Sequence, residues 1–166
     1  MKERLLQLLE QFKSKKILVI GDLMLDKYIW GDVERISPEA PVQVVAVRKE
    51  SFVPGGAANV ANNIAALKAS VILSGIVGKD DAKVILIEEL ENRNINTAGI
   101  FTDIGKPTTQ KIRIMAVSQQ LLRVDYEKKI RVSNDEELEI LKYIKTIINN
   151  IDIILISDYS KIPKSD

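Results

Sequence analysis

The sequence predicts a doubly wound α/β fold, in which a mostly parallel sheet carries helices on both faces and a small β-lid is inserted. Three observations predict it. Short apolar runs that end in glycine alternate with amphipathic stretches, a pattern typical of parallel strands joined by helices. A proline-bounded hairpin interrupts this alternation, and a Pro-Gly-Gly sequence runs directly into a helix of small residues. We therefore expect a single domain over residues 1–166.

Composition excludes several classes of function. Of the 166 residues 46% are hydrophobic, and the net charge is +1, which suits one folded core. The chain has no cysteine and no histidine, which excludes disulfides, thiolate zinc sites and serine–histidine triads. Any metal would need oxygen ligands, and we expect no metal site in this chain. The lysines are scattered, which argues against nucleic acid as a partner.

The N-terminal segment predicts a packing helix followed by a buried strand. Met1 to Ser14 has an amphipathic pattern, and we expect this helix on the edge of the sheet. No apolar run is long enough to span a membrane and no signal peptide is recognisable, so we expect a cytoplasmic protein without a membrane partner. Lys16 to Gly21 is the strand. Asp22 and Asp26 follow its carboxyl end, where ligands bind in open α/β sheets, although surface acids are equally common.

The next stretch predicts an inserted hairpin rather than a crossover helix. Tyr28 to Asp32 and Val42 to Val47 read as strands on either side of a turn that contains two prolines. Together with residues 107–118, the insert over about residues 27–52 would form the lid. It would equally serve as a dimerisation flap, and the two roles are compatible.

A glycine pair then opens the central helix. Gly55 and Gly56 follow Pro54, and we expect bare N–H groups at the helix start to face an oxygen-rich ligand. The alternative is an ordinary turn before an ordinary helix. Asn59 shares a side of this helix with Asn63. The residues expected to anchor the helix on the core are Val60, Ile64 and Leu67.

The middle of the chain predicts a strand, a helix and two further strands. Ser70 to Gly78 is a buried strand, and Asp80 is the expected N-cap of a helix that runs to Asn92. Its inward residues would be Val84, Ile87 and Leu90. A short strand follows at Thr97 to Thr102.

Polar and apolar residues alternate from Thr109 to Met115, which predicts a half-exposed strand. Lys111 and Arg113 would then share its open face, and such a pair of cations suits a phosphate-bearing ligand. The alternative is a solvated strand face. Gln119 to Asp125 continues the β region.

The last segment predicts a long helix and a buried strand. The helix would run from Val132 to Asn149 with Ser133 or Asn134 as its cap. A buried strand over Ile151 to Ile156 would end beside Asp158, which is a further site candidate at a strand end. The residues expected to face inward from the helix are Leu138, Leu141, Ile144 and Ile148.

Six ordered stretches resemble the ribokinase-like (PfkB) carbohydrate kinase family, and within it the kinases that act on D-glycero-D-manno-heptose 7-phosphate. The resemblance covers nearly the whole chain. The stretches are Gly21–Tyr28, Arg35–Val42, Pro54–Ala61, Thr108–Arg113, Gln119–Asp125 and Ser157–Lys161.

The resemblance implies transfer of a phosphoryl group from ATP to the anomeric hydroxyl of the heptose, a step in making ADP-heptose for the lipopolysaccharide core. The positions that would bind the sugar are Asp26, Gly55, Gly56 and Asn59. Lys111 and Arg113, with Arg123, would bind the sugar's 7-phosphate. Apart from the resemblance, we expect a homodimer formed through the inserted β-lid, since an uncovered apolar edge or face favours self-association.

The chain departs from the family in its length. Family members carry their ATP site and catalytic aspartate in a C-terminal half that we expect to be missing here, so we assign no catalytic residue. ATP and Mg²⁺ are implied for the full-length family, with no secure site in this chain. Neither Gly78-Lys79 nor Gly105-Lys106 has phosphate-loop spacing, and the dinucleotide glycine fingerprint of oxidoreductases is absent. After Lys161 the tail differs from the family. The alternative function is a sugar-phosphate-binding or dimerising fragment without turnover.

Overall fold

The computed structural model describes residues 2–116, 119–128 and 132–159. Two predictions fall outside these residues, namely lid residues 117–118 and the tail from position 160 onward. The helices and strands, in chain order, are α1 (Lys2–Phe12), β1 (Lys16–Gly21), β2 (Leu23–Ile36), β3 (Gln43–Gly56), α2 (Ala57–Ala66), β4 (Ser70–Gly78), α3 (Asp81–Glu91), β5 (Ile95–Asp103), β6 (Thr109–Ala116), β7 (Gln119–Tyr126), α4 (Asn134–Ile147), a 3₁₀ turn (Ile148–Asn150) and β8 (Ile153–Ser157).

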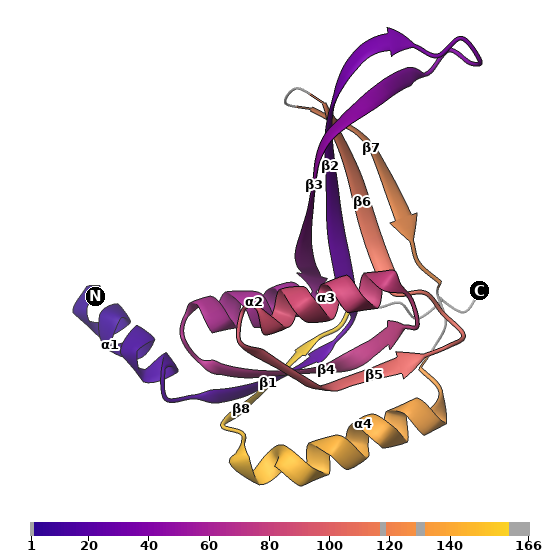
Figure 1. The fold of residues 1–166 in the computed structure, drawn as a ribbon. Coiled ribbons are helices and arrows are strands. Elements are labelled where there is room, and N and C mark those ends of the chain that lie inside the picture. Colours follow the sequence, from indigo (N-terminus) through magenta and orange to yellow (C-terminus); the bar gives the residue numbers. More distant parts are fainter. Residues whose placement is uncertain (1, 117–118, 129–131, 160–166) are drawn as a thin grey trace, which may run out of the picture.

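The body of the protein is a parallel four-stranded sheet in the order β5-β4-β1-β8. Helices α2 and α3 lie on one face of this sheet and α4 lies on the other, so the body has three layers (Figure 1). The central strands β1 and β4 are apolar runs because helices cover both of their faces. Leu18, Val19 and Leu73 from these strands are fully buried in the core. This is the doubly wound arrangement that the sequence predicts.

Helices α2 and α3 face the sheet partly as expected, since Ile64 and Leu90 are buried, and partly through other residues. In α3 the buried side chains are Ala82, Leu86 and Leu90, whereas Val84 is 55% exposed. In α2 small residues and Ile64 are buried, and Leu67, the expected end of the apolar stripe, is exposed at the C-cap. Apolar residues occur on neighbouring stripes of both helices, so periodicity alone did not identify the stripe that meets the sheet.

Helix α4 begins as predicted and turns a different side to the sheet. Ser133 is its N-cap and forms a capping box with Glu136. Tyr143 packs edge-on against Phe101 of β5, with ring centroids 6.1 Å apart. Burial raises the pKa of the Tyr143 hydroxyl. Of the residues expected to face inward, Ile144 is half-buried, while three are exposed: Leu138, Leu141 and Ile148.

Two terminal elements are more exposed than predicted. Helix α1 has no buried residue, and only Phe12 from it packs against the core, so its expected packing on the sheet edge is wrong. Strand β8 forms close to the expected position and pairs with β1, but it is an edge strand rather than the buried one expected. Ile156 of this strand is 72% exposed. Its start is fastened to β1 by Asp152, whose carboxylate accepts a 2.7 Å hydrogen bond from the amide of Lys16.

The second sheet, which we call the lid, has the strand order β3-β2-β6-β7 and projects from the body (Figure 1). Strands β2 and β3 form an antiparallel hairpin of two 14-residue strands. Strand β6 adds parallel to β2, and β7 pairs antiparallel with β6. Because β2 follows β1 after one residue and β3 runs directly into α2, the lid is joined to the body at the start of α2.

Among the described helices, none combines the length and apolar character needed to cross a lipid bilayer.

Candidate functional site

Asp22 lies where the body and the lid meet. Its amide donates to the carbonyl of Ser157 at the end of β8, and its carbonyl accepts from the amide of Ala57 at the start of α2. Its side chain accepts a 2.9 Å hydrogen bond from the amide of Tyr159. One residue therefore holds three segments together, which gives Asp22 a structural role beside its predicted role in binding.

The two glycines of the predicted site have different geometric reasons to be glycine. A Cβ on Gly55 would lie 2.7 Å from the Asp26 carboxylate, so the missing side chain leaves room for that carboxylate. Gly56 is the N-cap of α2 with φ of 58° and ψ of −132°, a conformation that favours glycine. A Cβ on Gly56 would also lie 2.4 Å from the carbonyl oxygen of Asp22.

The prediction of bare N–H groups at the start of α2 is wrong for its first residue, because the Ala57 amide donates to Asp22 at 2.9 Å. The helix has no side-chain N-cap hydrogen bond. Asn59 is exposed on the surface of α2. The first amide of α2 therefore joins the helix to the segment between β1 and β2, and the case for ligand contacts rests mainly on the lid residues.

Asp26 and Arg113 form an ion pair on one face of the lid. The distance from Arg113 Nη1 to Asp26 Oδ1 is 2.6 Å, and both side chains are about four-fifths buried, at 22% and 21% exposure. The hydrogen bond to Asp26 raises the pKa of Arg113, against a smaller opposing effect of burial. The guanidinium also lies 5.2 Å from the ring centre of Tyr28, which further restrains it.

Lys111 and Arg123 converge on a second carboxylate, that of Asp125. Lys111 Nζ lies 3.2 Å from one carboxylate oxygen, and Arg123 donates from Nε and Nη2 at 2.9 and 3.0 Å. Burial alone would raise the pKa of Asp125, but the hydrogen bonds from Arg123 and Lys111 outweigh it and the pKa is lowered. Asp125 is thus an ionised link between two cations.

The strand register places these charges on one face of the lid. Asp26 is opposite Lys111, and Lys111 is opposite Asp125 across the next strand pair. Side chains two residues apart share a face of a strand, so Arg113 and Arg123 lie on the same face. We call this surface the charged lid face, and it consists of Asp26, Lys111, Arg113, Arg123 and Asp125.

A pocket of about 530 Å³ lies at the foot of the lid, between the carboxyl ends of body strands and α4. Asp22 and Asp158 line it together with Lys106 and Lys128, and most of its other lining residues are apolar. None of the charged lid face residues lines this pocket. The structure therefore divides the charged residues of the predicted site between two neighbouring places, and Asn59 lies in neither.

Two residues on or beside the charged lid face, Asp125 and Tyr28, were not singled out as site residues from the sequence. Asp125 belongs to Gln119–Asp125, one of the stretches that resemble the family. Because it is two residues from Arg123 along a strand, the two side chains are predicted to lie on the same face of that strand. Tyr28 had no such signal, because its contact with Arg113 crosses from β2 to β6. Among the described residues, no group of three or more Asp or Glu side chains could hold a metal ion.

Comparison with known proteins identifies relatives along nearly the whole chain. Residues 14–165 match the pfkB family of carbohydrate kinases. The bifunctional protein HldE of Helicobacter pylori strain G27 is 52% identical over 147 residues, which cover 89% of this chain and 32% of that protein. HldE of Wolinella succinogenes is 49% identical over 145 residues, which cover 87% of this chain and 31% of that protein. The chain thus spans about a third of the length of the curated relatives it matches.

Solved structures share the fold at low sequence identity. The crystal structure of a putative sugar kinase from Clostridium perfringens has a TM-score of 0.64 and 16% identity, covering 86% of this chain and 43% of that one. Ribokinase from Arabidopsis thaliana, complexed with ribose and ATP, has a TM-score of 0.60 and 17% identity, and the match covers 90% of this chain and 47% of that one. Both comparisons agree with the ribokinase-like α/β fold.

Proposed function

Because this chain belongs to the pfkB family of carbohydrate kinases, we propose that its charged lid face and the adjoining glycines form the acceptor side of a sugar kinase. The reaction would transfer the γ-phosphoryl group of ATP to the anomeric hydroxyl of D-glycero-D-manno-heptose 7-phosphate. The observation that carries this proposal is the Asp26 carboxylate, which lies over Gly55 and is held by Arg113 at 2.6 Å.

A carboxylate in this setting is suited to bind sugar hydroxyls. An ionised carboxyl group accepts hydrogen bonds through two oxygens, and neighbouring hydroxyls of a sugar are donors at matching spacing. Arg113 engages Oδ1 of Asp26, and the remaining acceptor capacity of the carboxylate is open to a ligand. Gly55 lets that carboxylate lie close to the backbone, where a side chain would displace it.

The choice of a phosphorylated heptose rests on the motif resemblance and on the cations of the charged lid face. Lys111, Arg113 and Arg123 share this face with two carboxylates, so the face has a surplus of one positive charge. A phosphate monoester carries about −1.5 to −2 charges at pH 7, and such a surplus favours it. The product would serve ADP-heptose synthesis for the lipopolysaccharide core.

ATP is the proposed phosphoryl donor, and the solved relatives include a ribokinase complexed with ATP. The described residues supply no group of acidic side chains that fits a magnesium ion. We therefore propose that the described residues bind the acceptor sugar, and we assign none of them to a metal ion or to the nucleotide. A kinase that consumes ATP and a sugar phosphate would work in the cytoplasm.

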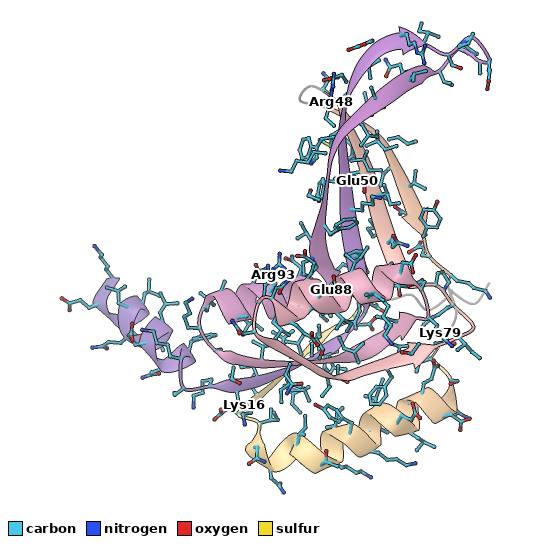
Figure 2. All side chains as sticks on the ribbon, in the orientation of Figure 1. Lys16, Arg48, Glu50, Lys79, Glu88 and Arg93 are labelled. Atoms are coloured by element: carbon cyan, nitrogen blue, oxygen red, sulfur yellow. The ribbon has the colours of Figure 1, made fainter. Side chains whose placement is uncertain are left out.

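The proposal is tested by isothermal titration of the 166-residue chain with heptose 7-phosphate. We expect saturable binding, and we expect Asp26→Asn to weaken it by at least about tenfold, since it removes one charge-assisted acceptor. The matched control is Asp32→Asn on the same strand. Asp32 pairs with Arg48 at 2.7 Å in the outer part of the lid, where Figure 2 shows Arg48 farther from the helices than Glu50.

Equal losses in the two variants, or none in Asp26→Asn, would remove Asp26 from the sugar site. ADP formation from ATP in the presence of the sugar phosphate would show turnover by this chain. Saturable sugar binding without ADP would instead assign it the alternative function, a sugar-phosphate-binding module without turnover.

A homodimer formed through the lid is the proposed assembly. The support is the lid face opposite the charged one, where Ile112, Ile114 and Val124 are half-buried and Leu122 is 54% exposed. A partner's apolar side chains would cover this face. Analytical ultracentrifugation tests it: we expect a dimer that Leu122→Lys converts to monomer, and a monomeric wild-type chain would overturn it.

A further inference from the structure

Strand β8 is an unprotected edge of the body sheet. It is the outer strand in the order β5-β4-β1-β8, and β1 is its partner among the described strands. The strand, Ile153–Ser157, reads Ile-Ile-Leu-Ile-Ser and contains no charged residue, proline or glycine. An edge strand presents a row of unpaired N–H and C=O groups, and natural proteins usually block such an edge with charges, proline or a bulge. The sequence of β8 supplies none of these.

The three other edges of the two described sheets carry such features. Body strand β5 has a register shift in its pairing with β4, and helices α3 and α4 both pack against it. Lid strand β3 carries Arg48 and Lys49, and lid strand β7 carries Arg123 and Asp125. Charges and irregular pairing discourage the addition of a further strand. Of the four edges, β8 is therefore the one suited to accept a strand.

One face of β8 is exposed as well as its edge. Leu155 is the register partner of Val19, and it packs against the core that α2 covers. Successive strand residues point to opposite faces, so Ile154 and Ile156 point to the side of α4. These two side chains are 45% and 72% exposed. Helix α4 packs mainly against β5 and β4, and it leaves this part of the sheet uncovered.

A hollow adjoins the uncovered face. Ile20 and Ile156 line the pocket of about 530 Å³ from the sheet, and Ile140 lines it from α4. A helix with its side chains is about 10 Å across, and apolar side chains of a helix placed beside α4 would enter this hollow. Parallel sheets occur with helices on both faces. The bare edge and the bare face thus suit one kind of partner, a parallel strand joined to an amphipathic helix.

The solved relatives have room in their folds for such a partner. The match covers 43% of the Clostridium perfringens sugar kinase and 47% of the Arabidopsis thaliana ribokinase, so more than half of each lies outside it. A sheet is extended only at an edge. Because the edges other than β8 are blocked, the rest of such a fold would join this chain beside β8.

We propose that the edge of β8 and its α4-side face form a docking surface for the remaining half of a pfkB fold, and that this surface binds that half when it is a separate polypeptide. The partner would add a strand parallel to β8 and pack an apolar helix side on Ile154 and Ile156. Main-chain hydrogen bonds would supply affinity, and the apolar side chains specificity. The inference depends on family membership and on the geometry of β8, and not on which sugar is bound.

A second copy of this chain fits the surface less well. Two copies that pair antiparallel through β8 would satisfy both edges. Each α4, however, packs mainly against β5 and β4 of its own sheet. Ile154 and Ile156 of both copies would then stay exposed beside the new strand pair, and a partner that brings its own helix would cover them.

The experiment mixes the whole 166-residue chain with the part of Helicobacter pylori G27 HldE that directly follows its 147 matched residues, produced as a separate polypeptide. Sedimentation velocity measures the complex. We expect one partner per chain, with a Kd of about 1 μM or tighter. The chain with Leu122→Lys should bind this partner as the wild type does, because Leu122 lies on the lid.

Ile156→Lys tests the surface directly. The complex should weaken at least about tenfold, because the substitution places an unpaired charge in an apolar contact. The matched control is Val84→Lys, which adds the same charge at an apolar residue that is 55% exposed on α3. Its affinity should stay within about twofold of wild type. Both positions are exposed, and circular dichroism with thermal midpoints checks that both variants are folded.

Hydrogen exchange locates the contact on the wild-type chain without any substitution. The β8 amides that point away from β1 should exchange rapidly in the chain alone and at least about tenfold more slowly in the complex. The outward amides of β7, at the edge of the lid, should be unchanged.

Three results would overturn the docking surface: no complex with the wild-type chain, equal losses in Ile156→Lys and Val84→Lys, or β8 amides that exchange as fast in the complex as in the chain alone. Self-association of the chain that protects the β8 amides would overturn it too, and would assign the edge to a second copy. Failure of the chain to bind heptose 7-phosphate is a separate result, which would overturn the proposed function and leave this surface standing.

Discussion

The Asp80 carboxylate accepts a hydrogen bond from the Thr108 amide at 2.8 Å, and its other oxygen accepts from the amide of Lys83 at 3.0 Å. One side chain therefore caps helix α3 and holds the segment that leads into lid strand β6. The Thr108 hydroxyl in turn accepts a 2.9 Å hydrogen bond from the Gly78 amide at the end of β4. The foot of the lid is thus fastened to a strand and to a helix of the body.

Asp80→Ala should destabilise the protein by about 1–3 kcal/mol, because it removes an N-cap and leaves the Thr108 amide without its acceptor. Urea unfolding measures this as a lower midpoint. The control is Asp81→Ala in the first turn of the same helix, where only a favourable charge near the helix N-terminus is lost. Equal midpoints for the two variants would contradict the bridging role of Asp80.

Thr108→Val should act on one hydrogen bond at the foot of the lid. Thr108 is completely buried, and valine has a similar shape but cannot accept from the Gly78 amide, at a cost of about 1–3 kcal/mol. Amide exchange followed by NMR should show faster exchange at Gly78. Thr108→Ser keeps the hydroxyl and should preserve the protection of that amide. Unchanged exchange in the valine variant would argue against this bond.

Gly55→Ala and Gly56→Ala should have opposite consequences. At Gly55 the nearest obstacle is the end of the Asp26 side chain, which can move, so the fold should persist while sugar binding weakens. At Gly56 the obstacle is backbone and φ is 58°, so alanine should cost about 2 kcal/mol or more in stability. Thermal melting and sugar titration of both variants check this contrast. A Gly55→Ala chain that binds sugar normally would contradict it.

Asp152 should make stability fall in acid. A backbone hydrogen bond from Lys16 and the interaction with Lys15 lower the pKa of Asp152 in the folded protein. A lowered pKa stabilises the fold above the unfolded value of about 3.9, and this contribution is lost as the pH falls through the folded pKa. Asp152→Asn should therefore be less stable than wild type at pH 7, and the difference should vanish well below pH 4.

Urea unfolding from pH 7 to pH 2 measures that difference. Asp81→Asn serves as the control carboxylate in the same titration. A stability gap between wild type and Asp152→Asn that stays constant over the whole range would show that the charge of Asp152 plays no part.

Trp30 should report sugar binding through its fluorescence. It is the single tryptophan of the chain, and it stacks on Tyr28 with ring centroids 6.2 Å apart. Tyr28 also contacts Arg113, which holds Asp26. Ligand binding at Asp26 should therefore change the tryptophan emission, and Asp26→Asn should abolish the change. If the titration shows saturable binding but the tryptophan emission does not change, the stacked pair of Tyr28 and Trp30 does not sense the ligand at Asp26.

Local signals in the sequence predicted the elements well. The caps at Asp80 and Ser133 depend on side chains that bond to amides three residues ahead, so they are visible in the sequence itself. The apolar runs of β1 and β4, each closed by a glycine, predicted a parallel sheet with helices on its two faces. The recurrence of charged residues at a spacing of two predicted that Lys111 and Arg113 share one face.

Burial was predicted less well, because it depends on which neighbours an element meets. The apolar residues of α4 occupy more than one stripe, and only the position of Phe101 on β5 decides that Tyr143 faces the sheet. Ile156 has the character of a buried strand residue, yet β8 is an edge in the described structure and leaves it 72% exposed.

The sequence by itself determined the order of strands and helices, the helix caps, and the residues that resemble a carbohydrate kinase, because these are properties of neighbouring residues. Only the tertiary structure decided how the charges are paired. Asp26 and Arg113 are 87 residues apart, and their contact requires β6 to align beside β2. That alignment also placed Lys111 and Arg123 around Asp125, since strand register, set by pairing across the whole lid, decides which side chains meet.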